Sequence, residues 1–210
     1  MRQAGIRIGL LAMLLGLVGC GIVPDLKGPS NLFNLTPKSS FTAGLPRVQW
    51  QLVIDEPIAA GGLDTARIAV MPTPIEMKYF ADASWTERAP RMVQTLLVES
   101  FENSGTIVAV GRQAIGLRSD FNLKTEVREF QVENFGAKVV RVRINAKLVR
   151  QPRQEIVVSR SFESTQPVAD GTMQSAILAW DEALGSVLRQ IVEWSITEGE
   201  ASWNARRTRG

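Results

Sequence analysis

Regular alternation of apolar and polar residues predicts β-strands over much of the chain. The clearest run has an apolar residue at every second position: Val140, Val142, Ile144, Ala146 and Leu148. Successive side chains of a strand point to opposite faces, so this run predicts a strand that is buried on one face only. Residues 151–154 separate it from a second run through Ile156, Val158 and Phe162, and the two runs together are typical of a β-hairpin.

Shorter runs of the same kind precede this hairpin. Residues 48–54 alternate, and an apolar run over 67–71 stops before Pro72. Residues 121–127 alternate as well, but the apolar positions then change parity at Phe130. A change of parity requires one extra residue in the strand, so we expect a β-bulge near Glu129.

Two segments have helical spacing. The first begins at Ser84, whose spacing to Glu87 suits a capping box, has Pro90 in its first turn and ends at Gly105. The second follows Asp170 or Thr172 as N-cap and repeats an apolar residue every three or four positions: Met173, Ile177, Trp180, Leu184, Val187, Ile191 and Trp194. Such a narrow stripe suits a coiled coil or a helix lying across a sheet, and further apolar residues such as Leu188 favour the sheet.

The order of these elements predicts an α+β fold, with a mixed, mainly antiparallel sheet and two helices packed on one face. The other face of the sheet would be exposed to solvent or bound to a partner. It would bear the alternate charged residues of the strands: Lys124, Glu126, Arg141, Arg143 and Lys147.

The N-terminus has the pattern of an export signal. Arg2 and Arg7 precede an uncharged apolar run over 8–18, which is shorter than the roughly 20 residues of a membrane-spanning helix. The run ends in the segment 17–20, Leu-Val-Gly-Cys, which resembles a bacterial lipobox, and Cys20 is the only cysteine of the chain. An ordinary secretory signal that ends in cysteine is the alternative. We expect residues 1–19 to be removed and Cys20 to become the acylated first residue.

The rest of the chain then divides into three parts. Residues 20–31 are rich in Pro and Gly and are expected to form a lipidated tether, followed by one domain over 32–197. Residues 198–210 form a basic tail that we expect to be frayed and solvated, with transient contact to an anionic surface as the alternative.

Charge does not indicate a nucleic-acid partner. The chain has 24 basic and 21 acidic residues, and loss of Arg2 and Arg7 with the signal leaves 22 against 21. Nucleic-acid binding needs a concentrated basic face, which a net charge of this size does not indicate.

The sequence also lacks the residues of several catalytic sites. It contains no histidine, so a Ser-His-Asp or Cys-His pair and an imidazole metal site are excluded. It has no glycine-rich phosphate-binding motif for ATP or dinucleotides. The closest carboxylate pairs, Asp55-Glu56 and Asp181-Glu182, are adjacent in sequence and therefore point apart. We expect no enzymatic activity, no metal and no cofactor.

Two groups of residues are candidates for contact with a partner or cargo. Arg141, Arg143 and Lys147 form a basic stripe on one strand face, unless they pair with acidic residues such as Glu126 and Glu155 on neighbouring strands. The aromatic residues before the first helix could form a hydrophobic binding lip or simply pack that helix on the sheet: Tyr79, Phe80 and Trp85.

The order of several short motifs behind the lipobox resembles one family, the ABC-type transport auxiliary lipoproteins, which include paraquat-inducible protein C. The resemblance covers residues 32–197. Its motifs are 67–70 (Arg-Ile-Ala-Val), Pro74, Tyr79-Phe80, Trp85, Pro90, Leu96-Leu97, Gly105, 120–123 (Asp-Phe-Asn-Leu) and Glu129-Phe130, with an aromatic-x-leucine segment at 33–35 and the Trp194 helix.

The resemblance implies an accessory role beside an ABC transporter whose periplasmic component carries MCE domains, a system that moves phospholipid or other hydrophobic molecules. Gly21 after the lipidated cysteine implies an outer-membrane anchor with the domain in the periplasm. A structural or assembly lipoprotein that partners an outer-membrane β-barrel is the alternative, and an envelope hydrolase using carboxylates is a third. Self-association into a homo-oligomer is also left open.

Overall fold

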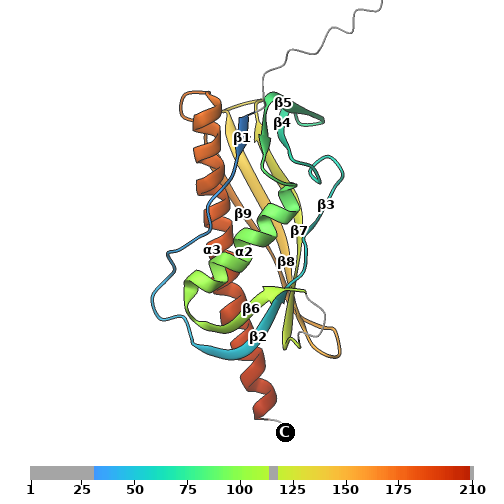
Figure 1. Ribbon diagram of the computed structural model, residues 1–210, viewed down its shortest axis with the longest axis vertical. Coiled ribbons are helices and arrows are strands. Elements are labelled where there is room, and N and C mark those ends of the chain that lie inside the picture. The colour runs from blue at the N-terminus through green and yellow to red at the C-terminus, as the bar shows by residue number, and fades with distance from the viewer. Residues whose placement is uncertain (1–30, 114–117, 209–210) are drawn as a thin grey trace, which may run out of the picture.

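A nine-stranded mixed sheet with both helices on one face accounts for the residues that the computed structural model describes, 31–113 and 118–208 (Figure 1). This confirms the predicted α+β class. The predicted signal, Cys20 and the tether up to residue 30 lie outside the described residues, and Asn31 already belongs to the first strand. The strands are β1 (Asn31–Phe33), β2 (Val48–Ile54), β3 (Ile58–Ala59), β4 (Arg67–Thr73), β5 (Glu76–Trp85), β6 (Ile107–Arg112), β7 (Phe121–Glu133), β8 (Val139–Arg150) and β9 (Glu155–Pro167).

Strand β7 is shared by the two halves of the sheet. Along one edge it pairs antiparallel with β8, and β8 pairs antiparallel with β9. Along its other edge it pairs in parallel with three short strands in succession, β2, β3 and β4. β6 extends the sheet beyond β2, while β5 and β1 extend it beyond β4.

The strands that have the most regular alternation form as expected. The β8–β9 hairpin turns at residues 151–154, and Val140, Ile144 and Leu148 are completely buried. The register between β7 and β8 shifts between Val127 and Glu129, which confirms the bulge. The parity change that this shift causes lets apolar residues on both sides of it face the same core.

The longer helix, α3 (Met173–Arg207), lies across β8 and β9, so its apolar stripe packs on the sheet. Thr172 is its N-cap, because its Oγ1 accepts a hydrogen bond of 3.1 Å from the Ser175 backbone N–H. The helix runs on through the segment expected to fray. The Trp203 ring lies 6.4 Å from the Phe121 ring, and this packing explains why the helix continues to Arg207.

Helix α2 (Ala89–Ser104) begins later than its sequence suggests. Ser84 belongs to the end of β5, and Arg88 is the N-cap without a side-chain hydrogen bond, so the predicted capping box is wrong. Pro90 does lie in the first turn, and Gly105 ends the helix in the left-handed conformation at φ 61°. Pairing of Ser84 with β1 and β4 takes precedence over the local capping signal.

The β4–β5 hairpin is the main element that the pattern missed. Strand β4 was expected to stop before Pro72 but continues to Thr73, and β5 returns from Glu76. The register is irregular between Val70 and Thr73, so Pro72 lies at a position where the ladder does not need its missing N–H. None of the described helices combines the length and the apolar composition of a membrane span.

Candidate functional site

The predicted basic stripe lies on the uncovered face of the sheet, where acidic residues compensate most of its charge. Arg141 contacts Glu133 through two hydrogen bonds of 2.7 and 3.2 Å and also pairs with Glu163. These contacts raise the pKa of Arg141 above its ordinary value, and the hydrogen bond with Glu133 contributes most. Arg143 donates a 2.7 Å hydrogen bond to Glu129. The acidic partners differ from the two that the sequence suggested: Glu129 and Glu133 lie on β7 after the bulge, and Glu163 lies on β9.

Lys147 differs from the two arginines. Its side chain is exposed, it faces Lys124 across the β7–β8 ladder, and it forms no ion pair within the part of the chain that the structure describes. Lys124 lies 3.7 Å from an Asp55 carboxylate oxygen and is thereby partly compensated. Lys147 is therefore the residue of the stripe whose charge is available to a partner.

The three aromatic candidates do not lie together on the surface. Trp85 is 2% exposed and packs against Trp180 and Phe130, with ring centroids 5.2 and 5.6 Å away. Tyr79 is half-buried, donates a 3.0 Å hydrogen bond to the Gly62 carbonyl and lies under the Arg67 guanidinium. Phe80 is half-buried against the core. Trp85 thus fixes the helix layer on the sheet, while Tyr79 and Phe80 keep part of their surface exposed.

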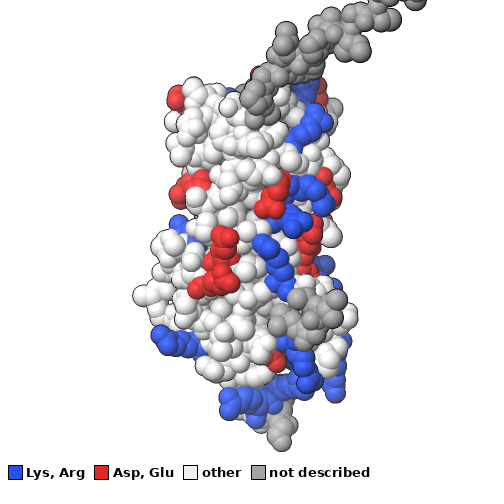
Figure 2. Space-filling view, in the orientation of Figure 1, with Lys and Arg blue, Asp and Glu red and all other residues white. Residues whose placement is uncertain are grey.

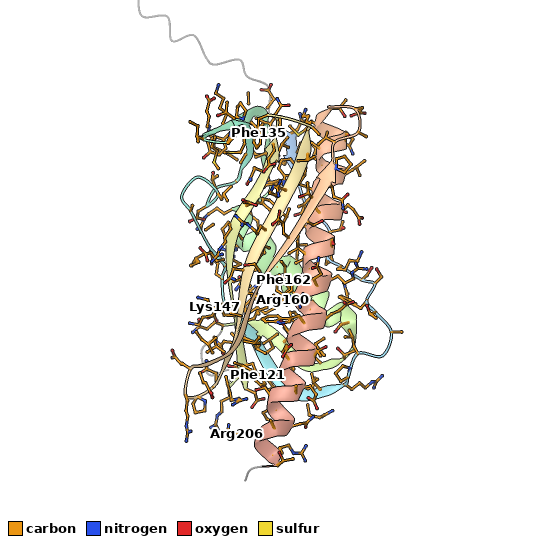
Figure 3. All side chains as sticks on the ribbon, turned by 180° about the vertical axis from the view of Figure 1, so that it is seen from behind. Phe121, Phe135, Lys147, Arg160, Phe162 and Arg206 are labelled. Carbon is orange, nitrogen blue, oxygen red and sulfur yellow. The ribbon has the colours of Figure 1, made fainter. Side chains whose placement is uncertain are left out.

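A cavity of about 620 Å³ lies at the end of the molecule where α3 terminates, and we call it the basic cavity. Its walls come from the start of β7, the edge of β2, the β8–β9 turn and the last turns of α3. Three arginines contribute to it, Arg118, Arg150 and Arg206. Basic side chains gather at this end of the molecule (Figure 2), and Arg206 lies there in Figure 3.

Asp120 holds the walls of the basic cavity together. Its carboxylate accepts a 2.8 Å hydrogen bond from the Gln51 backbone N–H, and its carbonyl accepts another of 2.8 Å from Gln151 N–H. Two positions on, the Asn122 amide donates a 3.0 Å hydrogen bond to Asp55. Between them Phe121 is completely buried, so the segment 120–123 alternates core residues with residues that join β2, β7 and the β8–β9 turn.

Arg150 connects the β8–β9 turn to α3. Its guanidinium lies 3.2 Å from Glu155 and donates hydrogen bonds to the carbonyl and hydroxyl oxygens of Ser202. Its Nε is buried without a hydrogen-bond partner. Arg118 and Arg206 are exposed on the rim and form no ion pair among the described residues. Three arginines and one acidic residue, Asp120, line the cavity, so it presents a net positive charge suited to acidic groups.

A second depression, the edge groove, has a volume of about 440 Å³ and lies between β9, α3 and the segment before β2. Phe162 and Trp194 form its apolar floor, with ring centroids 5.3 Å apart, and Arg160 lies 5.4 Å above the Phe162 ring. Figure 3 shows Arg160 and Phe162 beside each other near the middle of the molecule. Among the described strands β9 pairs only with β8, so its other edge has backbone groups available to a further strand.

Sequence reasoning did not find the basic cavity or the edge groove, because each joins residues that are far apart in the chain. Of the cavity residues, Asp120 was noted in the sequence as part of the 120–123 motif of the family resemblance. A further signal was available in α3, where the apolar or small positions continue past Trp194 through Ile196, Gly199 and Trp203. No group of three or more Asp, Glu or Cys side chains in the described residues could hold a metal ion.

Comparison with known proteins first defines the fold class. The crystal structure of protein XCC0632 from Xanthomonas campestris is 31% identical, with a TM-score of 0.79 over 83% of this chain and 99% of that chain. A crystal structure of another uncharacterised protein shares only the fold, at 13% identity and a TM-score of 0.64 over 79% of this chain and 97% of that chain. The chain is therefore a small α+β protein of the same type as XCC0632.

The chain belongs to the family of the ABC-type transport auxiliary lipoprotein component, whose family model matches residues 33–192. Among curated proteins it is similar to the uncharacterized protein bll6063 of Bradyrhizobium diazoefficiens, at 27% identity over 200 residues. The match covers 93% of this chain and 52% of that protein, so the chain spans about half the length of this relative.

Proposed function

We propose that this protein is a non-catalytic docking subunit of an MCE-type ABC transport system, anchored by Cys20 to the outer membrane with its domain in the periplasm. The cargo of the system would be phospholipid or another hydrophobic molecule. The family match over residues 33–192 carries the proposal, because the family is an auxiliary component of ABC-type transport. The lipobox-like segment that ends at Cys20 agrees with its description as a lipoprotein.

The hydrogen bonds and ion pairs of the candidate carboxylates support a non-catalytic role. Asp55 binds Asn122 and lies near Lys124, while its neighbour Glu56 pairs with Arg88 at 3.4 Å. Asp181 accepts hydrogen bonds of 2.7 and 2.9 Å from the backbone and hydroxyl of Thr36. These carboxylates join distant segments of the chain, which is a structural use rather than that of a general acid or base.

We assign the docking of the transporter to the basic end of the molecule. The basic cavity and Arg153 in the adjacent turn form one surface, and Lys147, which lies nearer the middle of the molecule (Figure 3), adds a further positive charge on the uncovered face of the sheet. In Figure 1 this end, where α3 terminates, lies opposite the end that carries β1, the first described strand. An acidic surface of a periplasmic partner would complement it. Tyr79 and Phe80 are candidates for a secondary apolar contact.

Affinity capture tests the proposed partner. Wild-type protein is recovered from detergent-solubilised envelopes and compared with a variant that reverses two exposed charges, Lys147→Glu with Arg153→Glu. The control is Arg189→Glu, which reverses one exposed charge on α3 outside the basic end. We expect wild type and control to retain an MCE-domain protein and the double variant to lose it. Recovery of a β-barrel protein instead would support the structural alternative, and recovery of neither would contradict the proposal.

The proposed location has its own test. Separation of inner and outer membranes on a density gradient should place the wild-type protein in the outer-membrane fraction. Gly21→Asp should move it to the inner membrane, since the residue after the lipidated cysteine directs sorting. Wild-type protein in the inner-membrane fraction would contradict the outer-membrane anchor while leaving the lipid anchor intact.

The edge groove is the candidate surface for self-association. The free edge of β9 offers backbone hydrogen bonds, and the Phe162–Trp194 floor offers apolar contact to a second copy. Light scattering of the purified protein measures its mass in solution. A homo-oligomer that Arg160→Glu dissociates would support this use of the groove, and a wild-type monomer would contradict it.

A further inference from the structure

We propose that the end of the molecule formed by the β4–β5 and β7–β8 turns rests on the membrane surface and places Ile75 and Phe135 among the lipids. The inference depends on the proposed anchor at Cys20 and adds an orientation to it. The occupant that we assign to this end is the lipid bilayer that holds the acyl chains.

Both turns expose large apolar side chains. Ile75 is 96% exposed and Phe135 is 46% exposed, and Met77 beside Ile75 is 37% exposed. Turns normally carry small or polar residues, which satisfy the backbone and face water without cost. A single exposed apolar residue is common on a soluble protein, but apolar residues on neighbouring turns suggest a shared contact.

The sheet brings the two turns together. Met71 of β4 is in register with Glu133 of β7, and the Asn134 N–H donates a 2.9 Å hydrogen bond to the Met71 carbonyl. Phe135 follows Asn134 directly, while Thr73 pairs with Glu76 on either side of Ile75. Figure 3 shows Phe135 at the opposite end of the molecule from Arg206.

The charged groups beside these turns have contacts of their own within the protein. Lys78 and Glu76 pair at 2.9 Å, and the Lys138 ammonium donates a 2.8 Å hydrogen bond to the Gly171 carbonyl. Contact with the interfacial region of a bilayer would therefore bury apolar surface without breaking these contacts.

The length of the tether permits this orientation. Asn31 pairs with Ala83, which is 83 − 76 = 7 residues from Glu76 along β5, or about 23 Å at the rise of a strand. Residues 20–30 are eleven residues and reach at most about 36 Å when extended. With the turns on the membrane, Asn31 stays within the reach of the lipidated cysteine.

Site-directed fluorescence on the lipidated full-length protein in vesicles tests the inference. Cys20 is the only cysteine and its sulfur is acylated, so a cysteine introduced elsewhere is the only free thiol. An environment-sensitive fluorophore is attached to Ile75→Cys or Phe135→Cys, in phosphatidylethanolamine–phosphatidylglycerol vesicles with or without brominated lipids. Val108→Cys is the matched control, because Val108 is 59% exposed and apolar but lies in β6. Arg153→Cys reports on the basic end.

We expect brominated lipids to quench the labels at 75 and 135 several-fold more than those at 108 and 153, as for side chains about 5–10 Å into the interface. Equal quenching at all four positions, or stronger quenching at 153, in protein that floats with the vesicles would overturn the inference and leave the anchor standing. Protein that does not float with vesicles would overturn the anchor and the inference together. Unchanged thermal unfolding of each labelled variant confirms that its fold is retained.

Discussion

The contact between Gly199 and Trp50 provides a quantitative test of how α3 packs on the sheet. A Cβ atom added to Gly199 would lie 2.6 Å from Cζ2 and 3.0 Å from Cη2 of the Trp50 ring. Trp50 is completely buried, its ring lies 5.0 Å from Phe121, and its Nε1 donates a 3.1 Å hydrogen bond to Glu200. The ring therefore has no free space into which it could move.

The same helix contains the matched control. A Cβ at Gly185 would meet only Cδ of Lys38, at an ordinary 3.8 Å. Replacing a helical glycine by alanine stabilises a protein by roughly 1 kcal/mol, and we expect this gain for Gly185→Ala. Gly199→Ala has the same gain in propensity, but overpacking of a core costs about 1–3 kcal/mol. The overlap at Gly199 suggests the upper half of that range, and so a net loss of about 1–2 kcal/mol.

Urea unfolding of a version that begins at Gly21 measures both effects. The two variants should differ by about 2–3 kcal/mol in free energy of unfolding. A double-mutant cycle adds Trp50→Phe, whose smaller ring removes the overlapping atoms, so Gly199→Ala should cost less in that background. If Gly199→Ala is as stable as Gly185→Ala, Trp50 can move without cost and the reasoning is refuted.

Three further outcomes follow from the structure. Hydrogen bonds from Thr172 lower the pKa of Asp170 below its ordinary 3.8. The ionised carboxylate therefore stabilises the fold above that pH, and the stabilisation is lost as the pH falls through the folded-state pKa. Asp170→Asn should remove this component from an acid unfolding profile. Glu133→Gln should reduce stability by about 1 kcal/mol in urea unfolding, because Arg141 loses its most buried charged partner, whereas Glu126→Gln in the exposed pair with Arg128 should change it little. Cys20→Ser should leave an unprocessed precursor that takes up no labelled palmitate, and a processed, labelled variant would show that acylation occurs elsewhere.

The elements that the sequence predicted well are those whose burial is set by one long, regular contact. Strand β8 alternates because α3 packs on one of its faces, and α3 repeats every three or four residues because it lies across the same strands. Strand β5 was missed because most of it is exposed and only its last residues enter the core. Near its end, the spacing of Ser84 and Glu87 imitates a helix start.

The surfaces that could bind a partner were harder to predict for a different reason. The basic cavity combines residues near positions 51, 120, 150 and 203, which pairing across β7 and the packing of α3 bring together. Which acidic residues pair with Arg141 and Arg143 depends on the exact β7–β8 register after the bulge, and a shift by one residue would give these arginines other partners. Local sequence patterns carry no information about such long-range registers.

The position of β7 has a consequence for the order in which the molecule can assemble. Synthesis proceeds from the N-terminus, so β2, β3 and β4 exist before the strand that joins them, which begins only at Phe121. Until then the first half can form only two separate groups, β1–β5–β4 and β2–β6 with α2, and neither has β7 or α3 to complete its core. A newly made N-terminal half should therefore be vulnerable to proteases and to aggregation, and a chain truncated before residue 121 should not fold.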